Sequence, residues 1–233
     1  MKRIGKENVY NRNVWLKKTL KNIPPGKKIL DVGAGECPYT EFCNHLEYTS
    51  QDFCKYTNKK DNKGLHHKKW DETKIDIISD ITSIPVLDNS FDAIMCIEVL
   101  EHVPNPLLAI KEMHRVLKNK GKLILTAPFS SLIHFSPFHY YTGFSYNFYK
   151  YHLLKLGFKI LDISYNGNYY EYMAQELRRL PKIATQYSNI KINKKQGSKI
   201  KEVLSILDNL NKKDNASSEL LCYGLHVIAI KEK

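Results

Sequence analysis

Long apolar runs are missing from this sequence. No stretch approaches the ~20 consecutive apolar residues that span a bilayer. No apolar segment follows the charged start Met1–Lys6 either, so we expect neither a transmembrane helix nor a secretory signal. Cysteine is sparse, with five residues and no Cys-x-x-Cys pair, which is typical of reduced thiols rather than a disulfide framework. We therefore expect a cytoplasmic protein.

A metal-binding pattern is also missing. The adjacent His66 and His67 and the nearby Cys54 lie in a polar stretch, without two further ligands at the spacing of a zinc site. No metal site is therefore predicted, and any group transfer is expected to proceed without a metal ion.

Acidic residues are fewer than basic ones. The chain has 36 Lys and Arg against 24 Asp and Glu, a formal charge of +12, and much of the excess lies in the N-terminal segment and between Arg178 and Lys213. Such a surplus favours contact with nucleic acid, anionic membrane surfaces or anionic substrates. It equally describes a solvated, lysine-rich surface. Charge alone therefore names no partner: nucleic acid is not favoured, peripheral membrane contact stays open, and no oligomeric state is predicted.

Strand patterns alternate with helical patterns along the chain. Its 233 residues suit a single domain, residues 1–233, with a helix at about 8–23 and a helical, Lys-rich insertion at about 168–217 before the last strand. This alternation predicts a doubly wound α/β sheet. A short helix is expected from Pro38 to His45, and Gly121 is expected to end the helix that Asn105 caps. Strands are expected at residues 28–32, 47–52, 75–79, 91–97, 122–127, 158–163 and 225–230.

Two glycines one residue apart follow the first strand. In Gly33-Ala34-Gly35 the backbone can turn sharply and lie flat against a ligand, because no Cβ blocks the approach. A dinucleotide fingerprint needs a third glycine where the next helix starts, and this turn has none. The flanking acids Asp31 and Glu36 would also repel a pyrophosphate. An acid-lined glycine turn instead suits a cationic cofactor such as S-adenosylmethionine (SAM), which carries an ammonium and a sulfonium.

Two further acids follow the second and third strands. Asp52 can accept hydrogen bonds from both ribose hydroxyls, and Asp80 from the adenine amino group, while Ile81 packs on the ring. Each acid alone is also an ordinary turn residue. Acids at the ends of three successive parallel strands point to one edge of the sheet, where doubly wound folds bind ligands.

The glycine turn resembles motif I of the class I SAM-dependent methyltransferases, of the small-molecule, type 11-like kind. Residues Ile78–Val103 are similar to the post-I and motif IV region of that family, and Leu123–Phe129 to its following strand. The resemblance spans about Lys27–Ile163, and Tyr223–Ile230 completes the sheet. It implies a mostly parallel seven-stranded sheet with an antiparallel last strand and helices on both faces.

The resemblance also implies a role for each residue at the sheet edge. The methionine part of SAM would follow the glycine turn, the ribose would lie on Asp52, the adenine on Asp80 and Ile81, and the sulfonium beside Cys96 to Glu98. Cys37 departs from the pattern, since many members have a third glycine there. The predicted cofactor-binding residues are Asp31, Gly33, Ala34, Gly35, Asp52, Asp80, Ile81 and Cys96.

Methyl transfer from a sulfonium depends chiefly on alignment, and a general base is needed only where the acceptor must lose a proton. Candidates for the base are His102 and His139, and Glu98 can orient the acceptor or the cofactor amine. Each histidine has a structural hydrogen-bonding role as its plainer interpretation. The aromatic stretch Phe129–Tyr151 is expected to do two things: His134–Tyr141 face the acceptor pocket, and the later rings mostly pack a helix on the sheet.

The acceptor is the open point. The Glu98–Val103 stretch is similar to that of small-molecule methyltransferases, which suggests O-methylation of a small hydroxylated acceptor such as a glycan or sugar precursor. C- or O-methylation of a quinone-type molecule is the alternative. An NAD(P)-dependent short-chain oxidoreductase is a rival class, because Tyr146 and Lys150 have its Tyr-x-x-x-Lys spacing. A nucleic-acid methyltransferase and a non-catalytic binding protein are weaker rivals.

Overall fold

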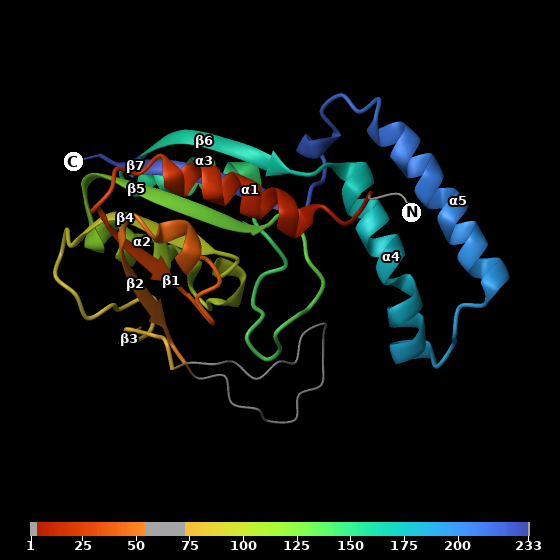
Figure 1. The fold of residues 1–233 in the computed structure, drawn as a ribbon, viewed down its shortest axis with the longest axis horizontal. Helices are drawn as coiled ribbons and strands as arrows, with labels where there is room; N and C mark the ends of the chain where they lie inside the picture. The colour runs from red at the N-terminus through yellow and green to blue at the C-terminus, as the bar shows by residue number, and fades with distance from the viewer. Residues whose placement is uncertain (1–3, 55–72, 233) are drawn as a thin grey trace. The chain divides into compact units, whose positions relative to one another are not determined.

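The computed structural model describes residues 4–54 and 73–232, so the sequence features at His66 and His67 lie outside the described residues. One seven-stranded sheet organises the fold, with the strand order β3-β2-β1-β4-β5-β7-β6 (Figure 1). The strands are β1 (Lys28–Val32), β2 (Glu47–Asp52), β3 (Ile77–Ile78), β4 (Phe91–Ile97), β5 (Leu117–Pro128), β6 (Phe158–Asn166) and β7 (Gly224–Lys231).

Parallel pairing holds the first half of the sheet together. β1 lies between β2 and β4, β3 pairs with β2, and β5 with β4, all in parallel. β7, the last strand of the chain, runs antiparallel to β5. The burial of both faces explains why β1 and β4 have almost continuous apolar sequences. The predicted doubly wound sheet with an antiparallel last strand is confirmed.

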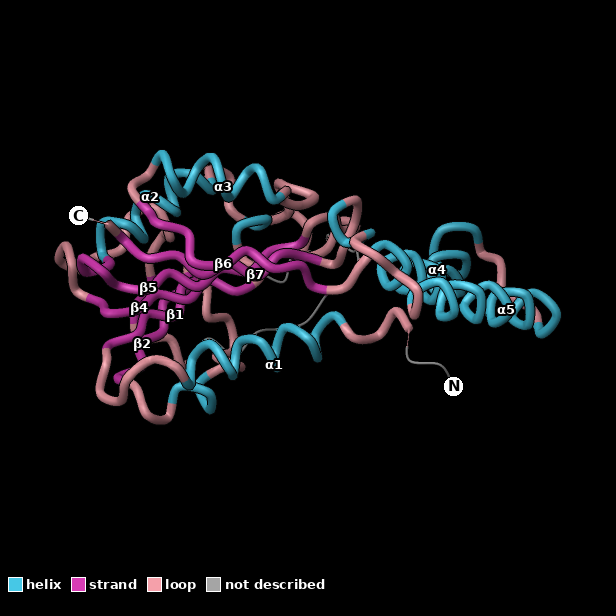
Figure 2. Tube along the Cα trace, turned by 90° about the horizontal axis from the view of Figure 1, so that it is seen from above, coloured by secondary structure: helices cyan, strands magenta, loops and turns pink. Residues whose placement is uncertain are grey.

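Residues 15–164 and 224–233 form one compact unit, which contains most of the sheet. Figure 2 shows helices on both faces: α2 (Pro106–Val116) and α3 (Tyr146–Lys155) on one side, and α1 (Asn8–Lys21) on the other. Leu16 and Leu20 of α1 are fully buried against Ile29, Met95 and other strand residues. Burial of such side chains contributes about 1.5–3 kcal/mol each, so α1 is held mainly by this apolar stripe.

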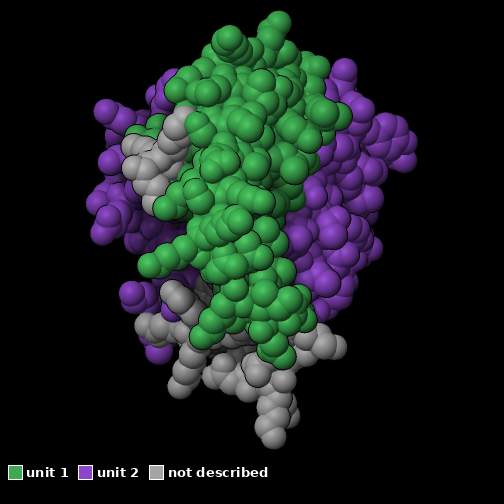
Figure 3. Space-filling view, turned by 90° about the vertical axis from the view of Figure 1, so that its right-hand side faces the viewer, with its two compact units in different colours: residues 1–14, 165–223 green, residues 15–164, 224–233 purple. Residues whose placement is uncertain are grey.

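Residues 1–14 and 165–223 form the second compact unit (Figure 3). It contains α4 (Tyr169–Ser188) and α5 (Lys194–Asn211), which pack through Ile4, Ala174 and Leu204. Both helices fall within the predicted Lys-rich insertion, and the single-domain organisation stays a prediction. None of the helices among the described residues is both long and apolar enough to cross a membrane.

Two local predictions are wrong. The helix expected from Pro38 to His45 is only a four-residue 3-10 helix, Thr40–Cys43. It follows Cys37, whose positive φ of 56° interrupts the turn before it. Gly121 does not end α2, which already ends at Val116; Leu117 is fully buried and pairs with Phe91 as the first residue of β5. Strand pairing at this buried position therefore overrides the helical pattern.

Candidate functional site

The carboxyl ends of β1, β2 and β3 bring the predicted acids to one edge of the sheet. Asp31 lies in β1 opposite Ser50 of β2, and Asp52, the last residue of β2, pairs with Ile78 of β3. Asp80 follows β3 by two residues. The negative charge of Asp52 acts on Asp31, which shows that these two carboxyl groups are close. We refer to this edge as the acidic edge.

The glycine turn crosses the acidic edge in a left-handed conformation. Gly33 has φ +72°, and a Cβ at this position would lie 2.6 Å from both methyl groups of Val99. Gly35 has φ +55°, and its amide donates to the Asp52 carboxylate at 2.9 Å. The amide of Ala34 donates to the Gln51 carbonyl at 2.9 Å. These bonds fix the turn against the end of β2.

Asp31 is a buried acid with unusual electrostatics. The hydroxyl of Tyr48 donates to its Oδ2 at 2.7 Å. Burial raises the pKa of Asp31 to about 7, the Tyr48 hydrogen bond opposes this rise, and the charge of Asp52 adds to it. No Lys, Arg or His pairs with this carboxyl within residues 4–54 and 73–232. An external cation is the partner that would favour its charged form.

The side chain of Asp80 stabilises the turn that follows β3. Its Oδ1 accepts from the amide of Thr82 at 2.8 Å and from the Thr82 hydroxyl at 2.7 Å. The carboxylate is exposed, so a further donor can reach it. Ile81 next to it is buried, with 9% of its surface exposed. This pair therefore remains compatible with the predicted adenine role.

Cys96 and Glu98 lie along and just after β4. Cys96 is fully buried, and burial raises the pKa of its thiol well above the usual range. Glu98 takes a positive φ of 57°, which is uncommon for a residue with a side chain. Its Oε1 accepts from the Thr126 hydroxyl at 2.9 Å, and its amide donates to the Thr126 carbonyl at 2.9 Å. Glu98 is thereby held in place by β5.

His102 and His139 come together although 37 positions separate them in sequence. His102 ends a short 3-10 helix, η2 (Leu100–His102), and its ring centroid lies 5.8 Å from that of His139. His134 lies 4.7 Å from His139 by the same measure. Burial, and to a smaller extent His134, lowers the pKa of His139.

Two members of this group, His134 and Glu101, were not among the predicted catalytic residues, although His134 begins the stretch expected to face the pocket. Glu101 is fully buried, and its Oε1 lies 3.8 Å from Nε2 of His102 and 3.9 Å from Nε2 of His134. The sequence features that could have indicated this group are the adjacent Glu101 and His102 shortly after β4, and His134 and His139 in one aromatic segment after β5. Each part is weak alone, because only the fold shows that both segments leave neighbouring parallel strands.

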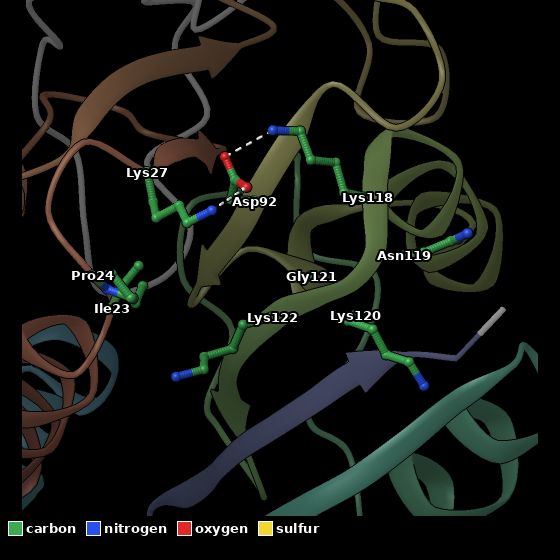
Figure 4. A pocket seen from close by; sticks show the side chains of 9 residues that line it. All are labelled: Ile23, Pro24, Lys27, Asp92, Lys118, Asn119, Lys120, Gly121 and Lys122. Carbon is green, nitrogen blue, oxygen red and sulfur yellow. Dashed lines mark hydrogen bonds and ion pairs between the residues drawn. The ribbon is translucent and has the colours of Figure 1, made fainter.

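A separate cavity of about 280 Å³ opens at the other edge of the sheet, near the amino ends of β1 and β4 (Figure 4). Asp92 forms ion pairs there with Lys27 at 3.2 Å and Lys118 at 2.9 Å. These pairs satisfy the acid, and none of the predicted site residues lines the cavity. It is therefore not the candidate site.

The sheet order, with the glycine turn after β1 and acids at the strand ends, defines a doubly wound protein. A sequence profile described as "Methyltransferase domain" matches residues 30–125. These residues contain the glycine turn, β2 to β4 and most of β5. The profile match and the similar proteins below support a class I methyltransferase family for this part of the chain.

Curated relatives match only part of the chain. It is 33% identical over 112 residues to a demethylmenaquinone methyltransferase from Chlamydia muridarum, covering 45% of this chain and 43% of that protein. A ubiquinone biosynthesis O-methyltransferase from Xanthomonas oryzae pv. oryzae is 33% identical over 104 residues, with 43% of each chain covered. The chain thus matches less than half the length of these relatives.

Similarity to solved structures extends further than similarity of sequence. The crystal structure of the cyclase SpnF has a TM-score of 0.57 at 21% identity, covering 95% of this chain and 80% of that one. At this identity the likeness concerns the fold alone. A cyclase with this fold also illustrates that the fold does not decide the reaction.

Proposed function

We propose that the protein binds SAM at the acidic edge and transfers its methyl group to a small hydroxylated acceptor. The observation that carries this proposal is Asp31, a buried carboxyl group beside Asp52 with a pKa near 7 and no cationic partner among the described residues. Such a group destabilises an anionic ligand and favours a cationic one.

The residues at the edge fit SAM in shape and in charge. The ammonium would face Asp31, and the methionine part would follow Gly33, Ala34 and Gly35, where a side chain at Gly33 would collide with Val99. Asp52 already accepts from the Gly35 amide through Oδ2 and from the Cys54 amide through Oδ1. Each carboxylate oxygen has a second lone pair for a ribose hydroxyl. The adenine would lie at Asp80 and Ile81, and Cys96 would lie beneath the sulfonium as part of the buried floor.

Bound SAM would supply an already activated methyl group, so the protein's task is to align the acceptor and exclude water. Glu98, His102 and His139 are the candidates for orienting the acceptor or taking its proton. Glu98 is held by Thr126, and the two histidines lie next to each other beyond the same strands.

The aromatic segment after β5 supplies an acceptor wall. Phe138 packs edge-on against Phe53 at a centroid distance of 5.2 Å, and Phe135 packs against His102 at 5.4 Å. Phe144 and Tyr149, later in the segment, are buried and pack α3 on the sheet. The first group suits the apolar faces of a sugar ring or an aromatic ring.

A glycan or sugar precursor, methylated on oxygen, is the acceptor class we propose. A quinone-type acceptor, methylated on carbon or oxygen, is the second candidate, and it is favoured by the names of the two curated relatives. An oxidoreductase is less well supported, because acids rather than a third glycine surround the turn. Tyr146 and Lys150 are both exposed on α3.

The proposed setting is the cytoplasm, and the proposed partner is the acceptor itself. All five cysteines are free thiols, including the buried Cys43, Cys96 and Cys222, which suits a reducing compartment.

Calorimetric titration with S-adenosylhomocysteine (SAH) and, separately, with NADPH tests the cofactor. We expect 1:1 binding of SAH and none of NADPH; the reverse result would assign the protein to the oxidoreductases. Incubation with methyl-labelled SAM and fractionated cell extract then tests the acceptor. Label in the glycan fraction supports the first candidate, and label in the quinone fraction the second.

A further inference from the structure

Three histidines from the segments that follow β4 and β5 converge. One ring nitrogen from each of His102, His134 and His139 lies within 4.8 Å of the others. His102 comes from η2 after β4, and the other two from the connection between β5 and α3. The ring centroids of His102 and His134 are 4.8 Å apart. We call these three side chains the histidine cluster.

Backbone carbonyls fix which nitrogen carries the proton in two of these rings. Nδ1 of His102 lies 2.5 Å from the Phe138 carbonyl, and Nδ1 of His134 lies 2.9 Å from the Leu132 carbonyl. A carbonyl only accepts hydrogen bonds, so each Nδ1 must be the protonated nitrogen. In the neutral ring, Nε2 is then the nitrogen that can act as a metal ligand. Such Nδ1–H to carbonyl bonds are the usual outer support of metal-binding histidines.

His139 supplies a third ring with unsatisfied nitrogens. Both of its nitrogens are inaccessible to solvent, and neither has a hydrogen-bond partner in the described part of the chain. A buried polar atom without a partner costs about 1–3 kcal/mol, so a ligand at this position would relieve a real deficit.

Glu101 supplies a negative charge at the same place. Its carboxyl group is fully buried, and Oε1 lies 3.8 Å from Nε2 of His102 and 3.9 Å from Nε2 of His134. Both distances are longer than the usual donor–acceptor distance of a hydrogen bond. The Glu101 carbonyl also accepts from the amides of Tyr140 and Tyr141, at 2.9 and 3.2 Å, which ties the segment beside His139 to η2. The Nε2 atoms of His102 and His134 therefore both lie within 4 Å of one carboxylate oxygen.

We propose that His102, His134, His139 and Glu101 form a binding site for one divalent transition-metal ion of the zinc type. Imidazole nitrogens prefer such ions, whereas Mg²⁺ and Ca²⁺ prefer oxygen ligands. Ligand atoms about 2.0–2.1 Å from a tetrahedral ion are about 3.4 Å apart. The ligand atoms of the cluster lie within 4.8 Å of one another, so they must approach by up to about 1.4 Å on binding, which side-chain rotation supplies.

The site has a clear place in the fold. The charges of Glu101, Asp31 and Glu98 all act on the Cys96 thiol, so Glu101, like Asp31 of the acidic edge, lies near the end of β4. An ion with an open coordination position can hold an acceptor oxygen and lower its pKa. With an ion bound, His102 and His139 would be metal ligands, and the general-base role considered for them under the proposed function would not apply. This inference replaces the prediction of metal-free transfer, and it stands on the cluster's geometry whether or not SAM is the cofactor.

Metal binding by the untagged, full-length protein tests the proposal directly. After chelation and dialysis, the protein is titrated with Zn²⁺, Co²⁺ and Mg²⁺ by calorimetry. We expect one Zn²⁺ or Co²⁺ per chain with a dissociation constant below about 10 μM, and much weaker Mg²⁺ binding. His134→Gln and His139→Gln should each weaken Zn²⁺ binding by at least about 100-fold, above the effect of losing an outer partner. His152→Gln, a half-buried histidine on α3 outside the cluster, is the matched control and should bind as the wild type does.

The Co²⁺ absorption spectrum of the wild-type protein keeps the test independent of whether the variants fold. Bands of nitrogen and oxygen ligation without thiolate charge transfer are expected. A thiolate band, unchanged Zn²⁺ affinity in both folded variants, tighter binding of Mg²⁺ than of Zn²⁺, or no stoichiometric binding would each overturn the site. SAH affinity, measured on the same samples, reports separately on the proposed function.

Discussion

Cofactor affinity should depend on the ionisation of Asp31. In the ligand-free protein, burial raises the pKa of this carboxyl to about 7. The ammonium of SAH interacts favourably with the charged form alone, so binding must displace the proton that the neutral form holds. The dependence of SAH affinity on this ionisation is tested with Asp31→Asn, whose amide does not titrate but can still accept the Tyr48 hydrogen bond.

The direction and size of the pH effect on SAH affinity follow from the coupling between binding and the ionisation of Asp31. With a pKa near 7, about a tenth of Asp31 is ionised at pH 6 and about nine tenths at pH 8, so affinity for SAH should rise about tenfold over this range, or about 1.4 kcal/mol. Removing the charge costs a charge-assisted hydrogen bond of about 1.5–3 kcal/mol. Asp31→Asn should therefore bind SAH about 10- to 100-fold more weakly at pH 8 than the wild type does.

Calorimetry at pH 6, 7 and 8 provides the assay, and any titration of SAH itself cancels when the two proteins are compared. In buffers of different ionisation enthalpy, the wild type should release a proton on binding near pH 6, and Asp31→Asn should release one fewer. Identical pH profiles for the two proteins would refute the reasoning.

The same group links folding stability to pH. The folded-state pKa lies above the unfolded value of 3.8, so the stabilising contribution of neutral Asp31 is full below pH 3.8 and is lost as the pH rises towards 7. Relative to Asp31→Asn, the free energy of unfolding of the ligand-free wild type should fall by roughly 2.5 kcal/mol between pH 5 and pH 8. Urea melts at both pH values measure this difference, and a constant gap would contradict it.

Three further substitutions separate the parts of the acidic edge. Tyr48→Phe removes the hydrogen bond that lowers the pKa of Asp31, so the midpoint of the SAH affinity profile should move to higher pH; an unmoved midpoint would contradict this. Asp80→Ala should weaken SAH binding about 10- to 100-fold while the free energy of unfolding changes by about 1 kcal/mol or less, because the carboxylate is exposed; unchanged affinity by calorimetry would remove Asp80 from the site. Gly33→Ala places a Cβ 2.6 Å from the Val99 methyl groups at a φ of +72°, and should lower the free energy of unfolding by about 1–3 kcal/mol in a urea melt; wild-type stability would show that the turn tolerates a side chain.

Much of the sheet was predictable from the sequence because its strands are buried on both faces. β1 and β4 have the short, nearly continuous apolar runs that are typical of buried parallel strands. Asn105 caps α2 as predicted, because its side chain accepts a hydrogen bond from the Leu108 amide. The errors arose where tertiary contacts override local pattern. Leu117 continues a helical stripe, yet it pairs with Phe91 and begins β5.

The candidate site also has features that the sequence predicts and features that depend on tertiary structure. Acids at the ends of parallel strands are predictable, since topology alone brings them to one edge. The proximity of His102 and His134 was not, because it depends on the path of the connection after β5. The state of Asp31 was also beyond the sequence, since its pKa reflects its burial and the nearby hydroxyl of Tyr48.

A crystal structure of the protein with SAH bound tests the central claim most directly. The account predicts one SAH molecule at the carboxyl ends of β1 to β4, with its ammonium at Asp31, its ribose at Asp52 and its adenine at Asp80 and Ile81. Electron density for SAH at any other edge of the sheet, or a saturated crystal with none at the acidic edge, would contradict the account.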